Sequence, residues 1–280
     1  MMFQIKPMQP EEFVFATELA NTMNWNMAIE DFHFMTLLEP DGCFVLFDDS
    51  KPIGIATCNS YGKVGWFGNL IVKEEYRGKG AGRQLVKHAI SYLHTKGVET
   101  IGLYAYSNLI GFYSNLGFQY DEDFSVLNAS ALKSISSETL PIVGTKCIPR
   151  IAEFDLRCFG GDRRKLLESI ILEQGNLSYC VSKDDDVIGY VAATVYEKMA
   201  WVGPLLCQEG NLDAAVMLLK GVLNKLTGLS VYAALPKKET ALADFFSFVG
   251  FKADFSVARM FFGPKVARNC IYLVESLERG

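Results

Sequence analysis

Hydrophobic and polar positions follow two different periods along the chain, and together they predict a mixed α/β fold. Short apolar runs typical of buried strands occupy residues 3–8, 43–47, 53–59, 64–72 and 100–105. Apolar residues at helical spacing indicate helices over 11–22, 29–38, 83–93 and, more briefly, 107–117. Polar turns at 48–52 and 61–63 predict antiparallel hairpins, and the helix at 83–93 predicts a parallel crossover. The pattern therefore favours the α/β class, as an α+β mixed sheet.

A glycine-rich loop stands between the strand at 64–72 and the helix that follows. It reads Arg77-Gly78-Lys79-Gly80-Ala81-Gly82. Glycines at alternate positions let backbone N–H groups converge, and the first turn of a helix adds unpaired donors at its positive end. This predicts a phosphate or pyrophosphate site, the alternative being a turn that only permits tight packing. The spacing does not match the triphosphate or dinucleotide glycine motifs.

Two motifs resemble the GCN5-related N-acetyltransferase (GNAT) family. Its acyl-coenzyme A loop follows the pattern [RQ]-x-x-G-x-[GA], which Arg77, Gly80 and Gly82 satisfy. Further on, Asn108 precedes Phe112-Tyr113 and Gly117-Phe118, as in the segment that the family places after its next strand. The two motifs stand in the family's order, and the resemblance covers residues 3–127.

The resemblance implies which residues hold acetyl-coenzyme A and which act on it. The expected coenzyme contacts are Leu70, Ile71, Val72, Arg77, Gly78, Lys79, Gly80, Ala81, Gly82, Arg83 and Asn108. Tyr113 would protonate the departing thiolate as general acid, the alternative being a core aromatic. The acceptor pocket would lie near Asn24, Trp25, Asn26 and Asp31, although Trp25 could instead be a core or lid aromatic.

The general base is left open by the sequence. No carboxylate lies on the strand 64–72, and Glu74 and Glu75 fall in the turn beyond it. A water chain, Asp31 or a group from the second half of the chain could remove the amine proton, or the amine could arrive neutral.

An internal repeat indicates two tandem GNAT folds. The pattern Trp66-x-Gly68-x-Leu70 recurs 135 positions later as Trp201-x-Gly203-x-Leu205, and Ile53-Gly54 recurs at the same offset. The predicted domains are residues 1–130, catalytic, and 138–280, with 130–138 as the connection.

The second copy appears degenerate where the chemistry should lie. Its loop position, residues 208–215, has one glycine and the acids Glu209 and Asp213, and Phe246 replaces the tyrosine. Three charged residues of this copy could either bind a charged acceptor or be exposed charges at the starts of helices: Asp155, Arg163 and Arg259.

Composition narrows the class of protein. The 280 residues are 50% hydrophobic and 21% charged, which suffices for two cores. A net charge of −5 argues against a nucleic-acid or membrane partner, and without a long apolar run or signal pattern we expect a soluble, cytoplasmic protein. Seven cysteines without a C-x-x-C pair and only three histidines predict free thiols and no metal site.

These observations predict an N-acetyltransferase that moves an acetyl group from acetyl-coenzyme A to a small-molecule amine. The alternatives are a protein N-terminal or lysine acetyltransferase and a non-enzymatic acyl-coenzyme A sensor. The resemblance specifies no acceptor, because acceptor pockets vary widely within one fold.

Overall fold

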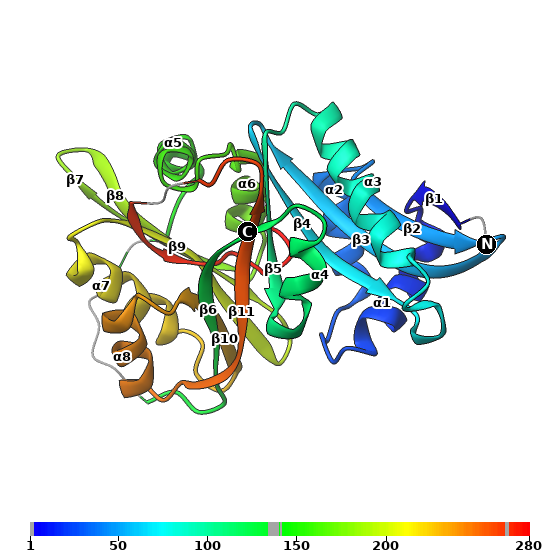
Figure 1. Ribbon diagram of the computed structural model, residues 1–280. Helices are drawn as coiled ribbons and strands as arrows, with labels where there is room; N and C mark the ends of the chain where they lie inside the picture. Colours follow the sequence, from blue (N-terminus) through cyan, green and yellow to red (C-terminus); the bar gives the residue numbers. More distant parts are fainter. Residues whose placement is uncertain (1–2, 134–139, 141, 267–268) are drawn as a thin grey trace.

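The computed structural model describes residues 3–133, 140, 142–266 and 269–280 (Figure 1). The labels α, β and η mark α-helices, strands and short 3₁₀-helices. We call the chain from β1 to β6 the first half and the chain from η4 to β12 the second half. The first half contains β1 (Phe3–Pro7), η1 (Pro10–Glu12), α1 (Phe13–Asn21), α2 (Ile29–Leu38), β2 (Cys43–Asp48), β3 (Lys51–Tyr61), β4 (Val64–Val72), η2 (Glu74–Tyr76), α3 (Ala81–Thr95), β5 (Thr100–Tyr106), η3 (Ser107–Leu109), α4 (Ile110–Ser114) and β6 (Gln119–Ala129). The second half contains η4 (Thr145–Cys147), α5 (Ile148–Phe159), α6 (Arg164–Leu172), β7 (Leu177–Lys183), β8 (Asp186–Val195), β9 (Met199–Gln208), α7 (Leu212–Leu223), β10 (Ser230–Pro236), α8 (Thr240–Phe248), β11 (Lys252–Phe262) and β12 (Cys270–Leu273).

The predicted elements of the first half are confirmed, with one correction. Strand β4 has the predicted bounds, β2, β3 and β4 are antiparallel, and β5 runs parallel to β4. Ser107 and Asn108, at the start of the predicted helix over 107–117, instead form the short 3₁₀-helix η3, and no side chain caps α4. In the second half, Asp184 and Asp185, both with positive φ, form the turn between β7 and β8. The predicted connection lies partly outside the described residues.

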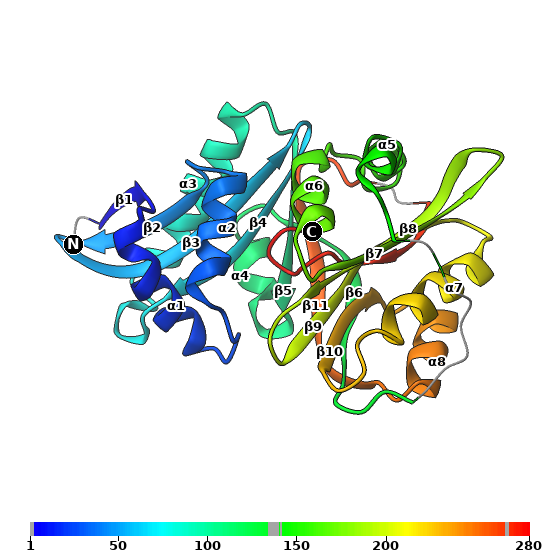
Figure 2. The same ribbon diagram turned by 180° about the vertical axis from the view of Figure 1, so that it is seen from behind.

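Helices cover both faces of one mixed sheet (Figures 1 and 2). In the first half, α1 and α2 lie on one face, and α3 and α4 lie on the other. In the second half, α5 and α6 pack on one face, and α7 and α8 pack on the other. Each half therefore has the helix-sheet-helix layering that the repeat in the sequence implies.

The two halves exchange a strand. In each half the strand after the short helix leaves its own sheet: β6 pairs with β10, and β11 pairs with β5. Strands β6 and β11 also pair with each other, antiparallel, at the centre of the sheet. The order β1-β2-β3-β4-β5-β11-β6-β10-β9-β8-β7 therefore makes one continuous sheet from two copies of the fold.

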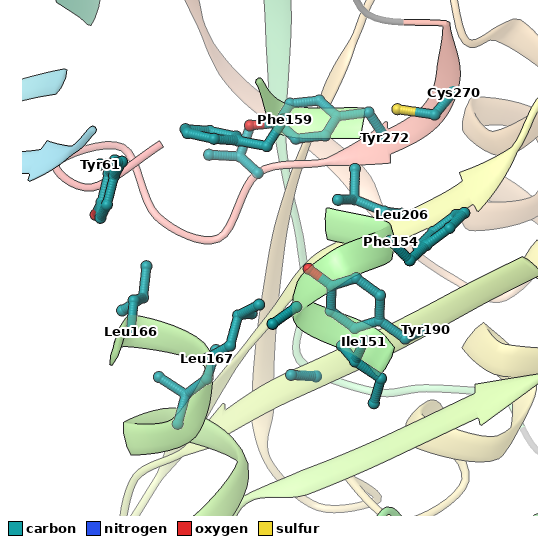
Figure 3. Close-up of a cluster of buried hydrophobic side chains, with 14 of the residues drawn as sticks. Tyr61, Ile151, Phe154, Phe159, Leu166, Leu167, Tyr190, Leu206, Cys270 and Tyr272 are labelled. Atoms are coloured by element: carbon teal, nitrogen blue, oxygen red, sulfur yellow. The ribbon is translucent and has the colours of Figure 1, made fainter. Parts of the chain in front are cut away.

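The contact between the halves is a shared aromatic core. Trp66 and Tyr61 of the first half contact Phe159 of the second, with ring centroids 6.1 and 5.7 Å away. Tyr190 and Tyr272 belong to the same buried cluster (Figure 3). Because large aromatic side chains dominate core energetics, the two halves are expected to unfold together.

Asp155 and Arg163 form a buried ion pair, which contradicts both interpretations of them in the sequence. Neither side chain is exposed, and the Arg163 Nη2 to Asp155 Oδ2 distance is 2.6 Å. Asp155 also accepts a hydrogen bond from Tyr190, and Arg163 donates one to the carbonyl oxygen of Gly280. Arg259 is likewise buried and paired, with Asp121 and Glu122. None of the three faces the cavity described below.

Replacing Asp155 by alanine is expected to lower the free energy of unfolding by about 3–5 kcal/mol, because the Arg163 charge would stay buried without its partner. Chemical denaturation of the full chain measures this change. The control is Glu153→Ala in the same helix, where the pair with Arg157 has side chains 71% and 61% exposed. The control should change stability by less than about 1 kcal/mol. Equal effects of the two variants would contradict the structural role of the buried pair.

Candidate functional site

The strands β4 and β5 separate at the centre of the first half. Pairing between them covers only Val64 to Trp66 on β4. A bulge then interrupts the pairing of β4 with β3, and within it Asn69 has a φ of 48°. Bulges bend a strand, so β4 turns away from β5. Among the described residues, the backbone groups of Leu70 to Val72 on the side facing β5 have no strand partner.

The glycine-rich loop follows directly from this opening. Arg77 Nε donates to the carbonyl oxygen of Val72 over 2.9 Å, which fixes the loop against the end of β4. Gly78 and Gly80 have φ values of 72° and 86°, in the left-handed region that glycine adopts without strain. A Cβ at either position would meet nothing within 4 Å. Helix α3 begins at Ala81, so its unpaired first-turn amides are next to this open space.

Tyr113 is held beside the loop by α4. Phe112 packs 3.6 Å from the position that a Cβ on Gly82 would take, which joins α4 to the first turn of α3. The Tyr113 ring contacts Phe67 and Phe118, with centroids 6.5 and 5.8 Å away. Burial raises the pKa of the Tyr113 hydroxyl above its usual value. The phenol is therefore protonated at neutral pH.

A cavity of about 1010 Å³ opens at Tyr113 and the separated strands. The predicted acceptor residues all line it: Asn24, Trp25, Asn26 and Asp31. Trp25 Nε1 donates to the Tyr106 hydroxyl over 3.0 Å, which fixes the indole in the cavity wall. Asp31 accepts a hydrogen bond from the amide of Ala28 and so also caps α2.

Most of the predicted coenzyme residues lie outside this cavity. Leu70 lines it, whereas the Ile71 and Val72 side chains are buried and do not. Residues 77–83 begin beyond the end of β4, and Asn108 is exposed in η3. The structure therefore places the loop next to the cavity, with the strand opening between them.

Two matches to known protein families establish the family of this chain. The acetyltransferase (GNAT) family matches residues 8–118, and the acetyltransferase (GNAT) domain matches residues 151–273. The chain is a tandem GNAT protein. As a GNAT-family N-acetyltransferase it is an acyltransferase enzyme.

Relatives and solved structures agree with this family. The uncharacterised N-acetyltransferase YitH of Bacillus subtilis (strain 168) is 23% identical over 216 residues, 73% of this chain and 72% of that protein. GCN5-related N-acetyltransferase 2, chloroplastic, of Arabidopsis thaliana is 33% identical over 78 residues, 27% of this chain and 30% of the plant protein. The crystal structure of a proposed acetyltransferase from Pyrococcus horikoshii has a TM-score of 0.84 at 22% identity, covering 99% of this chain and 96% of that one. This likeness shows a shared fold.

In the second GNAT copy, β12 fills the opening that the first copy leaves free. Leu205 to Cys207 are the repeat equivalents of Leu70 to Val72, 135 positions later. They pair with β12, from Leu273 to Ile271. The amide of Val274 then donates to the carbonyl oxygen of Ala234 on β10. The main-chain groups that are free in the first copy are therefore occupied in the second.

The sequence left open whether the second GNAT copy contributes to the site, and in the structure this copy lines the first copy's cavity. Its contribution comes mainly from the β8–β9 turn and from the segment 275–279, which we call the tail. The tail crosses β4 at Gly68, where a Cβ would lie 2.5 Å from the Cα of Glu278. The residue just before the tail, Val274, crosses β9 at Gly203, where a Cβ would lie 1.8 Å from the Val274 carbonyl oxygen. The repeated glycine of the Trp-x-Gly pattern was the available signal, because it permits close backbone approach.

Within the described ranges, no cluster of His, Cys, Asp and Glu side chains could hold a metal ion. No helix in these ranges is long and apolar enough to cross a bilayer.

Proposed function

We propose that the first GNAT copy transfers an acetyl group from acetyl-coenzyme A to the amine of a small molecule. The observation that carries this proposal is the proximity of three features: the open edge of β4, the glycine-rich loop that follows it, and Tyr113 in the wall of the neighbouring cavity.

The residues present fit acetyl-coenzyme A, which supplies the acetyl thioester. The backbone groups of Leu70 to Val72 that lack a strand partner would pair with the pantetheine amides, as a further strand would. The amides of residues 78–83 would hold the pyrophosphate, and Arg77, Lys79 and Arg83 would surround its charge. Asn108, in the turn before α4, is proposed to complete the coenzyme contacts.

Tyr113 is proposed as the general acid that protonates the departing thiolate. Its hydroxyl is protonated at neutral pH because burial raises its pKa. The aromatic rings that surround it keep the phenol in one orientation, as efficient proton transfer requires.

The cavity walls favour a small acceptor over a polypeptide. The α1–α2 turn, the β8–β9 turn and the tail all border the space, so that both halves enclose it. A protein acetyltransferase would instead need a groove along which an extended chain could lie. Asn24, Trp25, Asn26 and Asp31 are proposed to contact the acceptor.

Coenzyme A release measured with a panel of amines tests the function. The panel should contain arylalkylamines, polyamines, amino sugars and peptides with a free N-terminus or lysine. Turnover with a small amine supports the proposal, and turnover with the peptides alone would favour a protein acetyltransferase. Acetyl-coenzyme A binding without any turnover would favour a sensor.

Each chain is expected to bind a single coenzyme A, although it contains two GNAT copies. In the second copy β12 occupies the strand edge, and the loop position carries Glu209 and Asp213, which repel phosphate. Titration calorimetry with acetyl-coenzyme A should therefore give one site per chain, near residues 70–83. Two sites of similar affinity would show that the second copy is not degenerate.

A further inference from the structure

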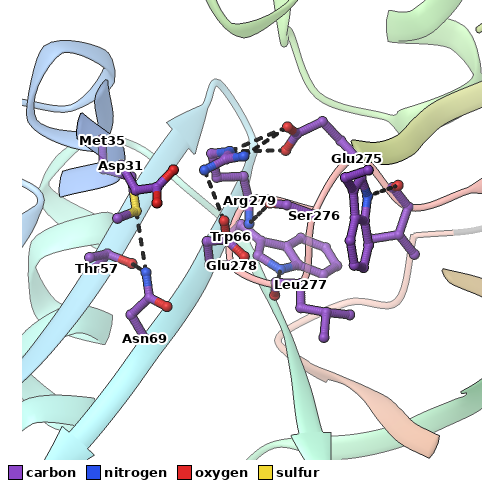
Figure 4. A network of polar contacts seen from close by, with 12 residues as sticks. Asp31, Met35, Thr57, Trp66, Asn69, Glu275, Ser276, Leu277, Glu278 and Arg279 are labelled. Atoms are coloured by element: carbon purple, nitrogen blue, oxygen red, sulfur yellow. Dashed lines mark hydrogen bonds and ion pairs between the residues drawn. The ribbon is translucent and has the colours of Figure 1, made fainter. Parts of the chain in front are cut away.

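Glu278 of the tail lies directly against β4 at Gly68. The tail lies so close to β4 that a side chain at position 68, in place of glycine, would overlap the backbone of Glu278. Trp66 Nε1 donates to the Leu277 carbonyl oxygen over 3.4 Å and fixes the tail on the other side (Figure 4). Glu278 therefore brings a carboxylate to a strand that has none of its own.

The Glu278 carboxylate borders the same cavity as Tyr113 and is partly exposed to it. Its side chain is 22% exposed, and Glu278 and Tyr113 both line the cavity. Glu278 is thus accessible to a molecule that enters the cavity.

Among the described residues, the contacts around Glu278 pair one cation with two carboxylates. Arg279 contacts Glu278 over 2.8 Å, but the same guanidinium also contacts Glu275 over 3.0 Å (Figure 4). One cation therefore serves two carboxylates. Burial raises the pKa of Glu278, Arg279 opposes the rise, and Glu275 and Asp31 add to it. Tyr196 also interacts with Glu278: burial raises the pKa of the Tyr196 hydroxyl, and Glu278 adds to the rise.

We propose that Glu278, supplied by the second GNAT copy, is the general base that takes the proton from the acceptor ammonium. This rests on the proposed function and assigns the base for which the strand 64–72 has no candidate. A carboxylate with a raised pKa is better matched to an amine proton near neutral pH than an ordinary surface carboxylate. The uncompensated negative charge also favours an acceptor that arrives as a cation.

The proton balance of the step is complete with these two side chains. The ammonium gives one proton to Glu278, and the neutral nitrogen then attacks the thioester carbonyl carbon. The C–N bond forms, the C–S bond breaks, and the thiolate takes the proton of Tyr113. The second nitrogen proton restores the Tyr113 hydroxyl, and the proton on Glu278 leaves to water.

Replacing Glu278 by glutamine tests this role in the full chain. With the amine of the panel that gives the fastest wild-type turnover, kcat should fall roughly 10²-fold, because a positioned base is lost. Affinity for acetyl-coenzyme A, measured by calorimetry, should stay within a few-fold. The control is Glu239→Gln, whose carboxyl pKa burial also raises but which lies outside the cavity, and it should keep wild-type kcat.

The pH profile and chemical rescue separate a base from a structural residue. In the wild type, kcat/KM should rise with pH through the Glu278 pKa, which lies above the ordinary carboxyl value, and Glu278→Gln should lose this rise. If Glu278→Gln fails to fold, Glu278→Ala with added formate is the second measurement, and formate should restore part of the activity. Wild-type turnover with an unchanged profile, or no rescue of a folded, inactive Glu278→Ala, would overturn the role of Glu278. Absence of wild-type turnover with every amine would instead refute the proposed function, and the base assignment with it.

Discussion

Replacing Gly80 by glutamate is expected to abolish acetyl-coenzyme A binding without unfolding the protein. Gly80 precedes α3 with a φ of 86°, and a Cβ there would meet nothing within 4 Å. The new side chain would therefore enter the space in front of the loop amides and bring a negative charge to the pyrophosphate. Each charge-assisted hydrogen bond is worth about 1.5–3 kcal/mol, and a micromolar affinity is only about 8 kcal/mol in total.

Gly97→Glu is a matched control for this variant. Gly97 lies at the other end of α3, with a φ of 81° and equally open surroundings. Both variants add the same charge and the same left-handed strain, on the order of 1–2 kcal/mol. Calorimetry should show binding to Gly97→Glu and none to Gly80→Glu. Unchanged affinity in a folded Gly80→Glu would remove the loop from the proposed site.

Tyr113→Phe is expected to slow turnover by roughly 10²-fold or more while coenzyme affinity stays within a few-fold. The variant removes only the hydroxyl, which we propose as the proton donor. The ring contacts with Phe67, Phe112 and Phe118 do not involve the hydroxyl, so the fold should survive. Steady-state kcat and calorimetric affinity, measured on the same preparation, separate the two effects.

Tyr179→Phe is the control for Tyr113→Phe, because it removes a hydroxyl from another buried tyrosine. Tyr179 is 3% exposed, lies in the core of the second copy and does not line the cavity. Its kcat should match the wild type. If Tyr113→Phe had the same kcat as the wild type, with the chemical step shown to be rate-limiting, Tyr113 would be a core aromatic and not the acid.

Local patterns in the sequence were sufficient to predict the elements and the family. Strand β4 matched its apolar run, because a strand that is covered on both faces needs buried residues at nearly every position. The loop glycines have the predicted backbone freedom, since positive φ at Gly78 and Gly80 depends on the residue type itself. The repeat also predicted two copies of the fold, which the family matches confirm.

Side-chain environments at a distance were harder to predict. Asp155 and Arg163 look like ordinary surface charges in the sequence, yet each is buried against the other. Their burial depends on Tyr190 and Gly280, which lie far away along the chain. The partner of a buried charge can be identified only from the tertiary structure, because the fold brings distant residues together.

The sequence by itself determined the strands, the helices, the glycine loop and the doubling of the fold, because these follow from side-chain periodicity and backbone preference. Only the tertiary structure decided how the copies complete each other: β11 beside β5, β12 in the second cleft, and Glu278 against Gly68. Main-chain pairing uses the same N–H and C=O groups in every residue, so the sequence does not state which strand takes which edge. The Glu278 carboxylate reaches the first copy's cavity because β4 has a glycine, Gly68, where the tail crosses it.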